Sequence, residues 1–274
     1  MTALLQKRSF QLGLFLVGLI LILALAADWL APFDPVRNNY RARLAAPNDI
    51  NWLGTDRYGR DILSRILYGA RVSLRIGLAV AVLSGLLGAA CGLAAGWRPN
   101  IDIWLMRIMD GLMAFPGLLL AIALAATLGP SETTAIIALT VAYIPRTARV
   151  MRGAVLVAIT QDYVEAARAV GARTSRILST HILPACAAPL AVQQTYVFAI
   201  AILAEAVLSF IGVGPPPPQP TLGNIIADGR DNMVEAPWIA LSPGLAIACI
   251  VLGLNLLGDS LRDALDPRMR RMVR

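Results

Sequence analysis

The sequence has few of the residues on which soluble enzymes depend. It contains one lysine, Lys7, one histidine, His181, and only 15% charged residues in 274, against about 25% in soluble domains. No G-x-x-x-x-G-K segment is present, so the chain cannot be a P-loop ATPase. Its three cysteines, Cys91, Cys186 and Cys249, form neither a zinc-type cluster nor a disulfide framework. We therefore expect no catalytic, metal or cofactor-binding residue.

Apolar residues are abundant instead. The chain is 57% hydrophobic with a mean hydropathy of +0.66. Most of its apolar runs approach the ~20 residues that a transmembrane helix needs, and the first is longer than a signal-peptide core. The sequence predicts an all-α integral membrane protein with six transmembrane helices, over residues 12–30, 72–97, 111–128, 133–144, 189–212 and 238–257.

One acidic residue lies deep in an apolar run. Glu205 is in the fifth predicted span, where a carboxylate is costly unless it is paired or protonated. Two interpretations stay open. Glu205 is either a translocation-path residue or a hydrogen-bonded residue that holds its span against a neighbour.

A polar, helix-prone loop follows the fourth predicted span, over residues 160–184. Gly171 suits the left-handed position that ends a helix. Thr174 or Ser175 can cap a second helix, which should stop near Leu183 because Pro184 disfavours helical geometry in the residue before it. The loop is either an ordinary surface helix pair or a docking site for another protein.

The spacing in this loop is specific. Glu165-Ala166-Ala167, three residues, Gly171, then Leu183-Pro184 resembles the EAA loop of ABC-importer permeases. In that family the loop is a cytoplasmic coupling helix that docks on the ATPase subunit. The resemblance implies that Glu165, Ala166, Ala167 and Gly171 carry coupling, with Asp162 and Arg168 as edge contacts.

A second motif lies between the first two spans. Residues 54–61 read Gly-Thr-Asp-Arg-Tyr-Gly-Arg-Asp, and Asp61 can cap a helix running to Tyr68. A self-paired turn over the membrane surface is favoured over a catalytic or ligand-binding loop. The motif resembles the C-type permeases for oligopeptides, dipeptides and nickel, and residues 205–214 resemble another stretch of that family.

The resemblance also predicts the assembly. A five-helix permease core over residues 71–274 would follow an N-terminal span and extracytoplasmic loop over residues 1–70. The expected partners are a B-type permease, two cytoplasmic ATPases that bind the ATP, a solute-binding protein and the lipid membrane.

The charge pattern bears on orientation. Cytoplasmic termini place 15 of the 24 lysines and arginines inside, although eight of the others fall between Arg37 and Arg75. We interpret Arg146, Arg149 and Arg152 as a cytoplasmic helix end rather than a nucleic-acid stripe. The predicted location is a bacterial inner membrane.

We expect a permease that imports di- or oligopeptides. The same family also carries nickel or metal chelates, glutathione and opines. Alternatives of another class are a secondary transporter that uses Glu205, for which no inverted repeat is visible, and a membrane scaffold that does not transport.

Overall fold

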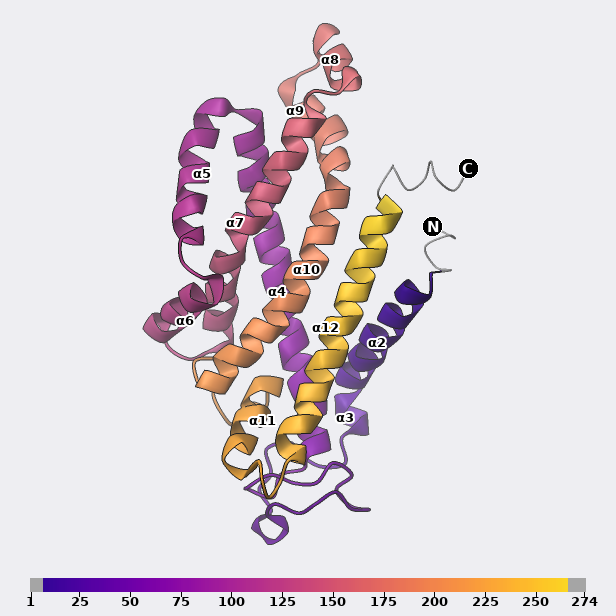
Figure 1. Cartoon of the computed structure of the whole chain (residues 1–274), viewed down its shortest axis with the longest axis vertical. Helices are drawn as coiled ribbons and strands as arrows, with labels where there is room; N and C mark the ends of the chain where they lie inside the picture. The colour runs from indigo at the N-terminus through magenta and orange to yellow at the C-terminus, as the bar shows by residue number, and fades with distance from the viewer. Residues whose placement is uncertain (1–6, 266–274) are drawn as a thin grey trace.

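The computed structural model describes residues 7–265 and is helical, with no strand among these residues. The long helices run alongside one another, with α8 at one end of the bundle and α11 at the other (Figure 1). Both the start of α2 and the end of α12 point toward the α8 end. The long helices are α2 (Arg8–Leu25), α4 (Ile62–Trp97), α7 (Glu132–Ala158), α10 (Leu183–Ile211) and α12 (Trp238–Leu265).

Shorter elements connect them. The helical ones are α3 (Ala27–Leu30), α5 (Pro99–Met113), α6 (Gly117–Leu128), α8 (Asp162–Ala169), α9 (Thr174–Ile177) and α11 (Leu222–Gly229). Tyr40–Ala42 and Arg230–Asn232 form 3₁₀ turns, and Leu178–Ile182 forms a π-helical turn that joins α9 to α10.

The all-α membrane fold is confirmed, but the count of six spans is not. Among residues 7–265, four helices are long and apolar enough to cross a membrane: α2, α4, α10 with the short helical turns before it, and α12. The predicted third span is instead α5 and α6, which meet at an angle of 84° and make at most one broken span. The bend follows from Pro116, which disfavours helical geometry at Phe115. Helix α7 is long enough, but it is not among the sufficiently apolar helices.

Two predicted helix ends were wrong. Helix α4 does not stop at Tyr68, and the helix that was to end near Leu183 continues. Pro184 occupies the first turn of α10, where a missing N–H removes no hydrogen bond. Pro145 likewise lies inside α7 rather than at its end, since neighbouring helices can compensate the freed backbone group in a membrane bundle. The domain boundary at residue 70 falls within α4 and stays a prediction.

Helices α4 and α7 come into close contact through glycines of α4. A methyl group added at Gly88 would lie 2.6 Å from Thr147 Cβ, and one added at Gly96 would lie 2.7 Å from Val155 Cβ. At Gly92 the obstacle is backbone, with the Arg152 nitrogen 2.8 Å away. Small residues allow this approach, and in lipid such packing is a principal source of helix association.

The α4–α7 contact predicts the effect of a single methyl group. Gly92→Ala should lower the thermal unfolding midpoint in detergent, because overpacking a close contact costs about 1–3 kcal/mol. Gly18→Ala is the matched control, since nothing lies within 4 Å of the position of its added methyl. This control variant should be more stable than the wild type by roughly 1 kcal/mol, because alanine is favoured over glycine inside a helix. Equal midpoints for the two variants would contradict the contact.

Candidate functional site

Helix α8 is anchored on one face and exposed on the other. Val164 is 0% exposed and Ala167 is 9% exposed. Both pack into an apolar cluster built from the end of α7, the segment after α8 and the start of α10. The cluster residues are Met151, Val155, Ala158, Val164, Ala167, Ile177, Ile182 and Cys186. The short helix therefore has a fixed position on the bundle.

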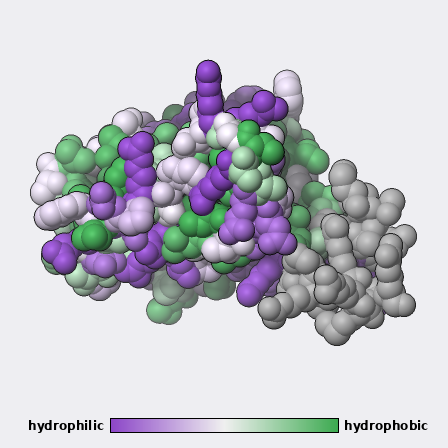
Figure 2. Space-filling view, turned by 90° about the horizontal axis from the view of Figure 1, so that it is seen from above, coloured by the Kyte–Doolittle hydropathy of each residue, from purple (hydrophilic) through white to green (hydrophobic). Residues whose placement is uncertain are grey.

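The opposite face of α8 carries most of the predicted coupling residues. Five of the six are exposed, and only Ala167 is turned inward. Hydrophilic side chains gather at this end of the molecule, interleaved with apolar ones (Figure 2). The exposed five are Asp162, Glu165, Ala166, Arg168 and Gly171. The structure thus brings them together on one surface, and their coupling role stays a prediction.

The turn that ends α8 has the predicted backbone. Gly171 has φ of +77°, the left-handed region that favours glycine, and its N–H donates to the Arg168 carbonyl at 3.0 Å. The predicted cap of the next helix was wrong. Arg173 holds the N-cap position of α9 without a side-chain hydrogen bond, and Thr174 is already helical.

Two features of this surface were not predicted from the sequence. Val170, just before the turn, is 83% exposed and presents an apolar side chain beside the charged ones. The Arg168 guanidinium lies 5.2 Å from the centre of the Trp97 ring, at the end of α4. The exposure of Val170 could have been predicted from the sequence. Val170 directly precedes Gly171, which ends the helix, so its side chain does not continue the buried face of α8.

Glu205 lies between helices rather than on an open surface. Its side chain is 0% exposed, and its two carboxylate oxygens accept hydrogen bonds from the Ser73 and Ser209 hydroxyls, each at 2.6 Å. Ser73 belongs to α4, so the carboxylate links α10 to α4. This geometry favours the interhelical role, and the translocation role stays a prediction.

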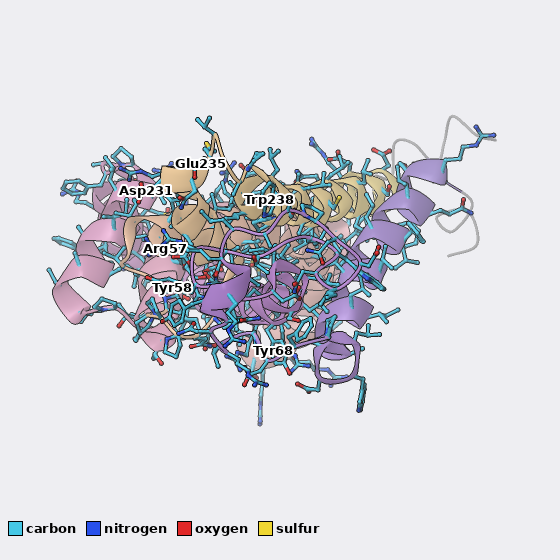
Figure 3. All side chains as sticks on the ribbon, turned by 90° about the horizontal axis from the view of Figure 1, so that it is seen from below. Arg57, Tyr58, Tyr68, Asp231, Glu235 and Trp238 are labelled. Atoms are coloured by element: carbon cyan, nitrogen blue, oxygen red, sulfur yellow. The ribbon has the colours of Figure 1, made fainter. Side chains whose placement is uncertain are left out.

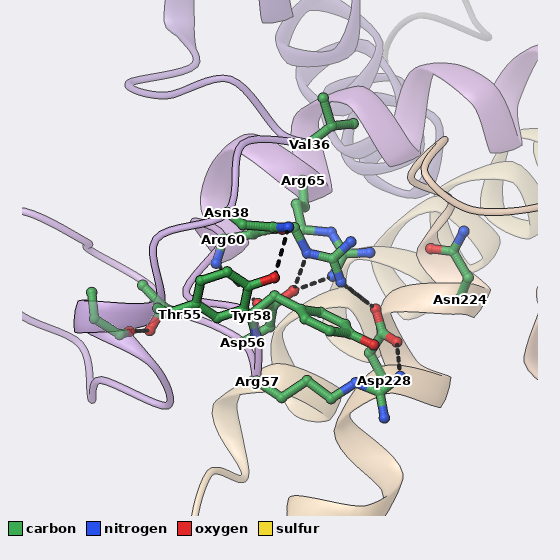
Figure 4. Close-up of polar contacts among 12 residues, drawn as sticks. Val36, Asn38, Thr55, Asp56, Arg57, Tyr58, Arg60, Arg65, Asn224 and Asp228 are labelled. Atoms are coloured by element: carbon green, nitrogen blue, oxygen red, sulfur yellow. Dashed lines mark hydrogen bonds and ion pairs between the residues drawn. The ribbon is translucent and has the colours of Figure 1, made fainter.

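The motif in residues 54–61 folds back on the chain. Asp61 caps α4 as predicted, since its side chain accepts from the Ser64 N–H. Asp56 is 0% exposed and accepts from Arg60 Nε and Arg65 Nη1, each at 2.6 Å. Asp228 of α11 accepts from the same two arginines at 2.8 and 2.9 Å (Figure 4).

The 31–61 segment is therefore fixed to α11 at this end of the molecule. Arg57 reaches Asp228 at 3.3 Å, and the Trp238 indole N–H donates to the Thr55 carbonyl at 3.3 Å. Figure 3 views this end from below, with Arg57 and Tyr58 over the bundle and Asp231 and Glu235 nearby. The charged residues of the motif thus pair both within the turn and with α11, which favours the turn interpretation, and the catalytic or ligand-binding alternative is untested.

A cavity of about 430 Å³ lies between the α5–α6 bend, α7 and α10. Its lining is apolar except for Tyr143 and Arg146, both from α7. No group of three or more His, Cys, Asp or Glu that could hold a metal ion occurs within residues 7–265.

Comparison with known proteins agrees with this architecture. Residues 84–271 match the family of binding-protein-dependent transport system inner membrane components, and residues 1–47 match the N-terminal transmembrane domain of oligopeptide transport permease C. The chain belongs to the first of these families. It is a multi-pass inner membrane permease, a class that works with ATPase and solute-binding subunits.

Named relatives cover nearly the whole permease. A putative peptide transport system permease protein of Brucella suis is 53% identical over 97% of this chain and 90% of its own length. The di/tripeptide transport system permease protein DppC of Pseudomonas aeruginosa is 44% identical over 94% and 88%. The dipeptide transport system permease protein DppC of Escherichia coli is 43% identical over 97% and 91%.

Solved structures share the fold of the permease. An inward-facing MetNI methionine ABC transporter matches with a TM-score of 0.55 and 22% identity, over 71% of this chain and 94% of the other. A crystal structure of an amino acid ABC transporter with histidines matches with a TM-score of 0.54 and 18% identity, over 76% and 94%. At this identity the likeness shows the fold alone.

The buried ion pairs predict an unequal response to neutralising two acids of the permease. Asp56→Asn removes the carboxylate that two buried arginines share, and breaking such a pair costs about 3–5 kcal/mol. Asp231→Asn removes a carboxylate that is 71% exposed, where ion pairs contribute about 0–1 kcal/mol. Thermal unfolding in detergent should show a clear loss for the first variant only, and a similar midpoint in both would contradict the network.

Proposed function

We propose that this chain is one of two permease subunits of an ATP-driven importer for di- or oligopeptides. The observation that carries the proposal is α8, a short helix anchored by Val164 and Ala167 with its polar face exposed at one end of the bundle. Such a helix can transmit force, because its inner face moves with α7 and α10. The cargo is inferred from the relatives, whose printed names refer to peptides, dipeptides or di/tripeptides.

In this proposal the chain catalyses nothing, and ATP is bound by separate subunits. Closure of the ATPases would push on Glu165, Ala166 and the turn at Gly171, and the bundle would turn its cavity outward. Asp162 and Arg168 would set the register of the contact through charge, which contributes to the choice of partner.

The orientation follows from the same contact. The α8 end faces the cytoplasm, where the ATPases are, together with both chain termini. The opposite end, with the 31–61 segment and α11, faces the solute-binding protein. The second permease subunit would be a B-type chain that completes the translocation path.

Other cargoes of the family are glutathione, opines, and nickel or metal chelates. The described residues 7–265 offer no cluster of metal ligands, so a metal would cross only as a chelate. Peptides are preferred because the permeases from Pseudomonas and Escherichia are both named for them.

The ATP-driven importer and a gradient-driven transporter that uses Glu205 as a proton or ion relay predict opposite results for Glu205→Gln. Glu205→Gln keeps the size and most hydrogen bonds of the side chain, so ATP-driven peptide uptake into proteoliposomes should persist, also with a proton ionophore present. Complete loss of uptake at normal protein abundance, or abolition by the ionophore, would favour the relay. Asp231→Asn is the matched control for neutralising an acid.

The proposed function is tested by co-purification of the tagged chain from its native membrane in mild detergent. A second permease and ATPases with P-loops should be recovered with the wild type. Gly171→Val should reduce recovery of the ATPases and peptide uptake together, because a β-branched residue is strained at φ of +77°.

Gly153→Val serves as control for the co-purification. Gly153 lies in α7 with open space around it and no positive φ, so this variant should retain the ATPases. Both variants should insert in normal amounts. Recovery of the wild-type chain without any ATPase would contradict the proposal, as would full ATPase recovery with Gly171→Val.

A further inference from the structure

Arg146 lies near the middle of α7, one of the long helices of the bundle. It is fourteen residues after Glu132 and twelve before Ala158, the two ends of α7. At 1.5 Å per residue each end is about 18–21 Å away. Arg146 is therefore well away from both ends of α7. The expectation that Arg146 marks a helix end was wrong because α7 continues through Pro145.

The three arginines of α7 differ in their partners. Arg149 pairs with Asp110 and Arg152 pairs with Asp102, both from α5. Arg146 forms no ion pair with any carboxylate within residues 7–265. Its contacts are with Tyr196 of α10, whose ring centre is 4.4 Å from the guanidinium carbon and whose hydroxyl is 3.3 Å from Nη1.

Arg146 is also the one charged residue among those that line the 430 Å³ cavity. That volume lies within the range of about 300–1,000 Å³ of small-molecule sites. In a membrane protein, an ionisable side chain that faces an otherwise apolar cavity is a candidate functional residue. The cavity therefore combines space for a small solute with one cation that lacks an anion.

We propose that Arg146 binds a carboxylate of the cargo while the cargo crosses the membrane. Arginine suits this task because its planar fork donates two parallel hydrogen bonds to a carboxylate. Every linear peptide with a free C-terminus carries this group whatever its side chains, so one arginine serves many sequences. The inference rests on the proposed function, since it assigns a chemical class to the cargo of that transporter.

The contact with Tyr196 fits a transient site. It holds the guanidinium in place without neutralising it, so a carboxylate is favoured on arrival and released when the helices move apart. A passing site must attract its solute without retaining it. The rest of the lining, from the α5–α6 bend and α10, is apolar. It offers no polar group that would discriminate strongly among the side chains of different peptides.

The test uses the intact co-purified complex in proteoliposomes, with ATP and saturating solute-binding protein. The probes are dialanine and its C-terminal amide, each at a concentration that saturates the binding protein by separate titration. Arg146→Gln should lower dialanine uptake about tenfold to a hundredfold, the range for losing a hydrogen bond to a charged group. It should also bring the two uptake rates together, because the amide lacks the carboxylate. Arg146→Lys keeps the positive charge but lacks the planar guanidinium. Its dialanine uptake should lie between that of the wild type and that of Arg146→Gln.

Arg149→Gln is the matched control, one turn along the same helix and with its own acid in the chain. It should keep the wild-type ratio of dialanine to amide uptake. An unchanged ratio in Arg146→Gln would overturn the inference. So would loss of the second permease from the Arg146→Gln complex, because the anion would then belong to that subunit. A wild-type complex without ATP-dependent uptake would instead overturn the proposed function, and this inference with it.

Discussion

Close packing of α4 against α7 is the constraint on which the rest of the structure depends. Lipid offers no hydrophobic gain for joining two apolar helices, so the backbones must approach until dispersion contacts suffice. Gly88, Gly92 and Gly96 permit that approach. The same turns of α7 carry Met151 and Val155, which form the base beneath α8. The position of the exposed helix therefore follows from the register of two membrane helices.

Local features of this fold were predictable from sequence. The left-handed turn at Gly171 and the cap at Asp61 depend on residues within a few positions, and both were found as expected. Helix ends at proline were not predictable. The proline rule describes an isolated helix, whereas Pro145 and Pro184 lie in segments that neighbouring helices and a π-helical turn keep helical. By contrast, the 84° bend between α5 and α6 has a local cause, since it falls at Pro116.

The candidate site also has parts that the sequence predicts and parts that it does not. The surface residues of α8 could be named from their spacing alone, because they lie within one short segment. The second acid that Arg60 and Arg65 contact could not be named, since Arg65 and Asp228 are 163 residues apart in the chain. The mid-helix position of Arg146 was missed for a related reason, because it depends on where α7 ends. Contacts between distant segments require the fold itself.

The π-helical turn at Leu178–Ile182 has a mechanical consequence. From Thr174 to Ile211 the chain forms one helical rod of 38 residues, about 57 Å long at 1.5 Å per residue. Its weak points, the wide turn and the prolines 184 and 189, all lie in the half nearest α8. Bending is easiest at such positions, so the rod has a pivot next to α8 and a stiff arm beyond it. In the proposed importer, a push at α8 would tilt the distant portion, which carries Tyr196 and Glu205.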